Sequence, residues 1–175
     1  MRREQKTPRN SCVRRAGCEE DRFSKRSTSE DIHKDRAKIR FIGHWEEQFP
    51  ASLKSVLHEC LEATKDYNDY FLNFFLAYSG DDEMRLAITR IAERLEPGEA
   101  VTDEMIKAEL MTRDMPPVDL LIRTGGEPHL SAGFMMWDLR DTQLFFSEKL
   151  YPDFDEIALQ EALLDYGKRG RRFGK

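Results

Sequence analysis

Residues 118–146, which read VDLLIRTGGEPHLSAGFMMWDLRDTQLFF, decide the fold. The stretch begins with an apolar run of strand length, continues through a polar glycine loop and ends in a second apolar segment. In open α/β sheets, ligands bind at the carboxyl ends of strands, where this loop is expected to lie. The loop carries Arg123, a Thr-Gly-Gly turn, Glu127, His129 and Ser131. A guanidinium, a hydroxyl and free backbone N–H groups suit a phosphate or diphosphate, so we expect an anion site here.

Charge is distributed unevenly along the 175 residues. Residues 1–40 contain 13 Lys or Arg against 7 Asp or Glu, whereas residues 41–175 contain 15 against 26. A basic arm on an acidic body could meet a nucleic acid, but this arm lacks the interleaved aromatic residues on which bases stack. We therefore expect no nucleic-acid partner.

The chain is expected to form one domain preceded by an arm. Residues 1–27 have little aliphatic content and no periodicity, which predicts a disordered or non-homologous basic arm before a domain at 28–175. No apolar run approaches the roughly eighteen residues that span a bilayer, and the amino terminus lacks the apolar core of a signal peptide. The expected location is the cytoplasm, with peripheral contact with a membrane as an open alternative.

Periodicity and turn residues predict alternating strands and helices. We expect strands at 37–43, 70–78, 118–123 and 144–146, and helices at 50–65, 81–95, 102–110 and 157–166. The 70–78 segment is so apolar that it is interpreted as a central strand buried on both faces, and Asp81 or Asp82 is expected to cap the helix that follows. The order predicts an α/β fold with a largely parallel central sheet flanked by helices.

Several segments together resemble the cis-prenyltransferases, the family of undecaprenyl diphosphate synthases. The resemblance is carried by 119–146, by Tyr151-Pro152-Asp153-Phe154 and by Arg171-Arg172-Phe173-Gly174. It continues upstream through Asp31-Ile32-His33, Ile39 to Gly43, Glu62-Ala63-Thr64-Lys65 and Leu76-Ala77-Tyr78-Ser79-Gly80, so that it covers roughly residues 28–175.

The resemblance implies an enzyme that condenses isopentenyl diphosphate with an allylic diphosphate to make a polyprenyl diphosphate. It implies that Mg²⁺ helps to neutralise the departing diphosphate. Arg123 and Ser131 match the isopentenyl diphosphate binders of the family, and His129 stands where a second Arg is usual. Arg172 and Gly174 match a tail that reaches the diphosphate site of the neighbouring subunit, which implies a homodimer or a heterodimer with a related subunit.

The chain also departs from the family pattern. Gln143 stands in place of a metal-associated Glu, and a neutral amide is a poor magnesium ligand. Ala132-Gly133-Phe134 contains an apparent one-residue insertion. No catalytic residue is identified, because the Asp-Gly-Asn-x-Arg segment that carries the family's catalytic Asp does not occur here. We therefore expect the isolated chain to be inactive, with an apolar strand edge exposed where a strand is missing.

Two alternatives to an enzyme remain open. The chain could be a non-catalytic accessory subunit that supplies its tail and a dimer surface to an active partner. It could also be a phosphate-binding interaction module that no longer takes part in prenyl transfer. At the level of single residues, Arg123 could instead be a salt-bridging surface residue, and Ser131 could be a helix cap.

Overall fold

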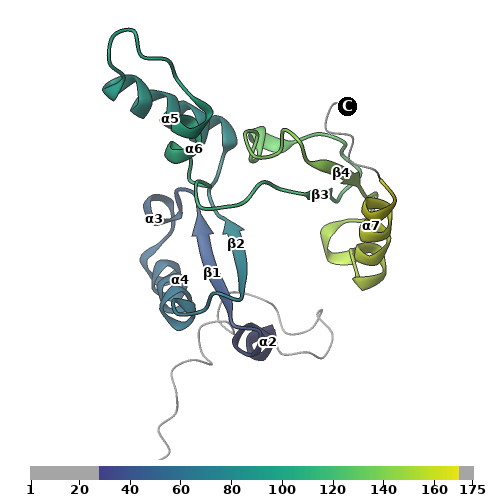
Figure 1. The fold of residues 1–175 in the computed structure, drawn as a ribbon. Coiled ribbons are helices and arrows are strands. Elements are labelled where there is room, and N and C mark those ends of the chain that lie inside the picture. Colours follow the sequence, from purple (N-terminus) through teal and green to yellow (C-terminus); the bar gives the residue numbers. More distant parts are fainter. Residues whose placement is uncertain (1–27, 170–175) are drawn as a thin grey trace, which may run out of the picture. The chain divides into compact units, whose positions relative to one another are not determined.

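A computed structural model describes residues 28–169 of the protein. The chain divides into two compact units, one ending at Tyr78 and the other beginning at Ser79 (Figure 1). Arg172 and Gly174 lie outside the described residues, as does the predicted arm at 1–27. The expectations for these segments therefore stay predictions.

Residues 28–78 of the first unit form two parallel strands and three helices. Its elements in chain order are α2 (Thr28–Lys34), β1 (Ala37–Ile42), α3 (Trp45–Gln48), α4 (Ala51–Thr64) and β2 (Tyr70–Phe75). The strands pair in parallel, in a register that runs from Ala37 opposite Tyr70 to Ile42 opposite Phe75. A parallel pair requires a long crossover connection, and α3 and α4 lie within it.

Helix α4 packs on β1 and provides the small core of this unit. Ile39 of β1 and Cys60 of α4 are both buried and in contact, with Ile32 and Phe41 against them. Thr64 Oγ1 accepts a hydrogen bond from the Ile39 N–H at 3.1 Å and donates one to the Cys60 carbonyl at 3.0 Å. One hydroxyl therefore joins the end of the helix to the strand.

The second strand differs from its prediction. Side chains on both faces of β2 are open to solvent, with exposed fractions of 65% for Tyr70, 49% for Phe71, 39% for Leu72 and 41% for Phe74. Among residues 28–78, β2 pairs only with β1, and α4 packs mainly on β1. The prediction of a central strand buried on both faces is wrong for the described residues, because their composition suits burial but no second strand flanks them.

The second unit contains the other strand pair. Its elements are α5 (Gly80–Arg94), α6 (Asp103–Glu109), β3 (Leu120–Arg123), the 3₁₀ turn η2 (Ser131–Gly133), β4 (Gln143–Phe146), the 3₁₀ turn η3 (Tyr151–Asp153) and α7 (Glu156–Lys168). Strands β3 and β4 are parallel, with Leu120 opposite Gln143 and Arg123 opposite Phe146. The α/β class and the parallel pairing are confirmed, but the described strands form two separate pairs rather than one sheet.

Side-chain caps begin the helices of the second unit. Ser79 Oγ accepts from the Asp82 N–H at 3.4 Å, Thr102 Oγ1 from Met105 and Asp155 Oδ1 from Ala158. The prediction of an Asp cap for α5 is wrong, because the helix begins at Gly80 and both aspartates lie inside its first turn. Carboxylates there still interact favourably with the amino end of the helix dipole.

Candidate functional site

Arg123 and Ser131 meet at the carboxyl end of β3. Arg123 is the last residue of that strand, and Ser131 begins η2. Arg123 Nη2 donates to Ser131 Oγ at 3.3 Å and to Glu127 Oε2 at 2.9 Å. The Arg123 side chain is 31% exposed, so that an anion in solution could reach it. The predicted pair is therefore brought together, and Glu127 joins it.

The glycine turn between them is bonded to the segment after β4. The Gly125 N–H donates to the Lys149 carbonyl at 2.8 Å and the Gly126 N–H to the Ser147 carbonyl at 3.0 Å, while Ser147 N–H donates to Arg123 O at 2.8 Å. The expectation of free backbone N–H groups is wrong for both glycines. Their donors hold two loops together, so a bound anion would depend on side chains.

Sequence reasoning missed Glu148, which lies against the turn. A Cβ added to Gly126 would lie 2.7 Å from Glu148 Oε2, so the carboxylate occupies the space that a larger residue would need. Gly126 also has a φ of +70°, which L side chains rarely adopt. Parallel strands deliver their following loops to the same edge, and this could have located Glu148 from the predicted strand at 144–146.

His129 extends the charged cluster on the exposed side. Its Nε2 lies 3.7 Å from Glu127 Oε2, and both side chains are about three-fifths exposed. Glu127 thus lies beside two potential cations, Arg123 and His129. An anion that approaches Arg123 would compete with this carboxylate.

Gln143 lies at the other end of its strand. It pairs with Leu120, whereas Arg123 pairs with Phe146, which is three residues and about 10 Å farther along β4. Gln143 Oε1 is buried and has no hydrogen-bond partner. No three His, Cys, Asp or Glu side chains in the described part of the chain gather as metal ligands do. These residues therefore do not provide a fit for Mg²⁺.

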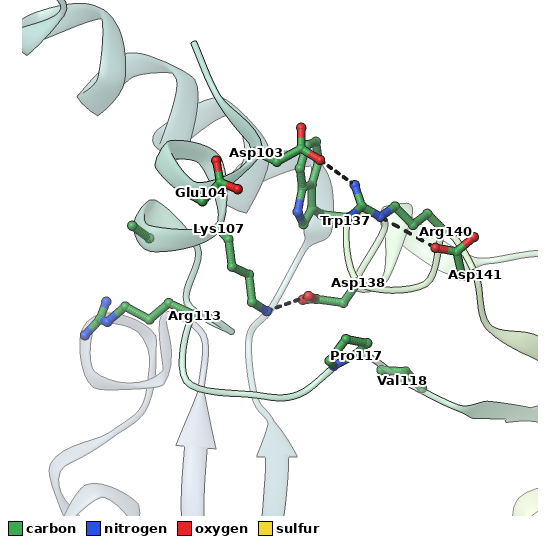
Figure 2. Close-up of a pocket in the computed structure, with 11 residues that line it drawn as sticks. Asp103, Glu104, Lys107, Arg113, Pro117, Val118, Trp137, Asp138, Arg140 and Asp141 are labelled. Atoms are coloured by element: carbon green, nitrogen blue, oxygen red, sulfur yellow. Dashed lines mark hydrogen bonds and ion pairs between the residues drawn. The ribbon is translucent and has the colours of Figure 1, made fainter. Parts of the chain in front are cut away.

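A separate hollow of about 560 Å³ lies beside α6 (Figure 2). Four of its charged side chains form two ion pairs: Lys107 Nζ lies 2.5 Å from Asp138 Oδ1, and Arg140 Nη1 lies 3.0 Å from Asp103 Oδ2. The Arg140 guanidinium also lies over the Trp137 ring, 5.3 Å from its centre. We therefore assign these contacts to holding the unit together rather than to ligand binding.

Comparison with known proteins identifies the family to which this parallel α/β chain belongs. Residues 17–174 match the family model Prenyltransf, described as "Putative undecaprenyl diphosphate synthase". The chain belongs to this family, the cis-prenyltransferases.

Curated relatives support the same assignment. Dehydrodolichyl diphosphate synthase 1 of Arabidopsis thaliana is 37% identical over 158 residues, covering 87% of this chain and 52% of the relative. An isoprenyl transferase of Streptococcus pneumoniae is 38% identical over 153 residues, covering 82% and 60%. The chain therefore spans between half and three-fifths of the length of these relatives.

Solved structures give the same fold. Lavandulyl diphosphate synthase from Lavandula x intermedia, solved with dimethylallyl diphosphate, has a TM-score of 0.75 and 27% identity, covering 83% of this chain and 64% of that one. A probable undecaprenyl diphosphate synthase from Campylobacter jejuni has a TM-score of 0.66 and 24% identity, covering 83% and 67%. The second likeness concerns the fold alone.

Proposed function

We propose that the protein works as a cis-prenyltransferase, which joins isopentenyl diphosphate to an allylic diphosphate and yields a polyprenyl diphosphate. One observation carries the proposal: in a chain of this family, the Arg123 guanidinium is hydrogen-bonded to Ser131 Oγ at the carboxyl end of a parallel strand. Charge-assisted bonds from a guanidinium to phosphate oxygens are strong and directional.

In this proposal, Arg123 and Ser131 hold the diphosphate of isopentenyl diphosphate. Arg123 exchanges its bond to Glu127 for bonds to phosphate oxygens, and Ser131 Oγ turns its proton toward the same group. His129 adds positive charge when protonated. Arg172 and Gly174 of a neighbouring subunit complete the site.

The reaction breaks a carbon–oxygen and a carbon–hydrogen bond and forms a carbon–carbon bond. The allylic carbon–oxygen bond breaks, and the departing diphosphate keeps the electron pair. The isopentenyl double bond then attacks the allylic carbon, a carbon–carbon bond forms, and the isopentenyl unit loses a proton to the released diphosphate, which sets the new double bond. In this proposal, Arg123 and Ser131 hold the attacking substrate in place, and no step is assigned to a metal.

A second candidate is an accessory subunit that binds the diphosphate without turning it over. Gln143 is the observation that favours it, because an uncharged amide occupies the β4 position where the family resemblance expects a metal-associated carboxylate. Such a subunit would lend its tail and surface to an active partner of the same family.

One assay separates the two candidates. Radiolabelled isopentenyl diphosphate is incubated with farnesyl or geranylgeranyl diphosphate and Mg²⁺, with the chain alone, with a full-length homologue and with both. Product from the chain alone supports the enzyme. If the chain alone gives no product but raises the product made by the homologue, the result supports the accessory subunit. If the chain gives no product alone and does not change the product of the homologue, both candidates are rejected.

Substitution of Arg123 tests the binding role directly. Arg123→Ala removes a charge-assisted hydrogen bond worth about 1.5–3 kcal/mol, so isopentenyl diphosphate should bind about tenfold or more weakly in isothermal titration calorimetry. Arg113→Ala is the matched control, because Arg113 is an exposed arginine of the same unit whose nearest carboxylate is 3.9 Å away. Equal losses in the two variants would contradict a role for Arg123.

A further inference from the structure

Gly80, the first residue of α5, packs directly against η2, the turn that carries Ser131. Gly80 is buried, and a Cβ placed on it would overlap the carbonyl oxygen of Gly133 and lie 2.6 Å from the carbonyl carbon. The obstacle is backbone, which cannot rotate away as the end of a flexible side chain can. Only glycine at position 80 therefore allows η2 to approach α5 this closely.

The backbone around this turn is left-handed at several residues. Ala132 has a φ of 47° and a ψ of 38°, Gly133 a φ of 58° and Met135 a φ of 46°. Left-handed conformations are costly for residues with a side chain and persist when the surroundings enforce them. A Cβ on Gly133 would in turn lie 2.7 Å from Asp81 Oδ1, so the first turn of α5 contacts η2 from two neighbouring residues.

A buried polar network connects Asp138, at the end of the segment that begins at Ser131, to helix α5. Glu83 of α5 is 2% exposed, and its Oε1 accepts the Thr112 N–H at 3.2 Å. Thr112 Oγ1 donates to Asp138 Oδ2 at 2.5 Å, and Lys107 Nζ donates to Asp138 Oδ1. The segment from Ser131 to Asp138 is thus joined to α5 at its start by direct contact and at its end through Thr112.

We infer that Gly80 is a positioning residue for the diphosphate site: its missing side chain seats η2 on α5 and thereby sets the distance between Ser131 Oγ and the Arg123 guanidinium. This inference rests on the proposed function for its ligand, isopentenyl diphosphate. It adds a residue that touches no substrate and that the Arg–Ser pair alone does not reveal.

Amide hydrogen exchange tests the seating without any ligand. In Gly80→Ala, peptides covering 131–139 should exchange faster while the middle of α5 and strand β3 keep their protection. Gly167→Ala is the matched control, because a Cβ at Gly167 of α7 meets nothing within 4 Å. Unchanged exchange at 131–139 would overturn the inference, and so would a loss of protection throughout the unit, since Gly80 would then serve folding alone.

A double-mutant cycle tests the link to Ser131. In calorimetric titrations with isopentenyl diphosphate, Ser131→Ala should weaken binding about tenfold, as expected for a bond to a charged group. Gly80→Ala alone should weaken isopentenyl diphosphate binding several-fold. In the Ser131→Ala background it should weaken binding less than about twofold, because the hydroxyl that Gly80 positions is gone. Equal costs in both backgrounds would contradict positioning.

The two experiments separate the two proposals. If the unsubstituted chain binds no isopentenyl diphosphate, the proposed function fails, while the exchange measurement still decides whether Gly80 seats η2. If the unsubstituted chain binds and the cycle is additive, the proposed function stands and the role of Gly80 is rejected.

Discussion

Glu127 determines how available the Arg123 guanidinium is in the free protein. The carboxylate is 2.9 Å from Arg123 Nη2 and 3.7 Å from His129 Nε2, so it neutralises charge that an anion would otherwise find. Because Glu127 is 61% exposed, water screens this ion pair, and it is weak compared with a buried one. A diphosphate, with more charge than a carboxylate, can displace it.

Removal of this charge should strengthen anion binding. We expect Glu127→Gln to bind inorganic pyrophosphate up to about fivefold more tightly, since exposed ion pairs contribute about 0.2–1 kcal/mol. Isothermal titration calorimetry at low and high salt measures the effect, which salt should reduce. Glu104→Gln, which alters a carboxylate beside the α6 hollow, is the control. Weaker pyrophosphate binding by Glu127→Gln would mean that Glu127 orients Arg123 rather than competing for it.

The sequence was sufficient to predict that Arg123 and Ser131 belong to one site, but not to predict the hydrogen bonds around them. The pair follows from a strand, a loop and a family motif, all of them local. The N–H groups of Gly125 and Gly126 are already hydrogen-bonded to the carbonyls of Lys149 and Ser147, which lie more than twenty residues farther along the chain. Such pairing between loops follows from strand register, which a local pattern does not contain.

At the scale of elements, the carboxyl-terminal helix depends on its cap. Asp155 Oδ1 accepts the Ala158 N–H at 2.9 Å and lies 3.3 Å from Lys149 Nζ. The bond from the Ala158 N–H, and then the bond from Lys149, lower the pKa of Asp155 below its ordinary 3.8. A lowered pKa in the folded state means that this contribution to stability is present above the ordinary pKa and is lost as pH falls through the lowered value.

Asp155→Asn should isolate that pH dependence. Asparagine also caps helices but does not titrate. The thermal unfolding midpoint of the wild type should exceed that of Asp155→Asn near neutral pH, and the difference should shrink as the pH falls below 3.8. A difference that stays constant over this range would show that the carboxylate charge at the cap contributes nothing.

All the predicted helices and strands are present, and two short helices were missed. The periodic segments predicted at 50–65 and 157–166 correspond to α4 and α7, with ends shifted by one or two residues. Helices α2 and α3 were missed, because Ile32 is the one aliphatic residue of α2 and the four residues of α3 are too few to establish a helical period. Their formation depends on neighbours, as with Trp45 of α3, which packs against Phe41 and His58.

At the scale of the whole molecule, β2 leaves apolar side chains in water. Tyr70, Leu72 and Phe74 alternate with Phe71 along the strand, so apolar groups lie on both of its faces. None of the helices in residues 28–169 is long and apolar enough to cross a membrane. An exposed apolar strand is a surface on which proteins associate.

Charging this surface should reduce association. We expect Leu72→Lys to weaken self-association of the purified chain about tenfold, which corresponds to the burial of one leucine side chain. Sedimentation velocity over a range of concentrations measures it, and fluorescence of an apolar dye should fall in parallel. Ile88→Lys, at a 59% exposed position on α5, is the control. If both substitutions act equally, β2 has no special part in association.

The division of the chain at Tyr78 and Ser79 has an evolutionary consequence. The contacts described here that order Arg123 and Ser131 come from residues 79–149, so they belong to the second unit alone. For the proposed diphosphate site, we therefore expect natural selection to act mainly on the second unit. Homologues aligned over the two units should then show different degrees of constraint.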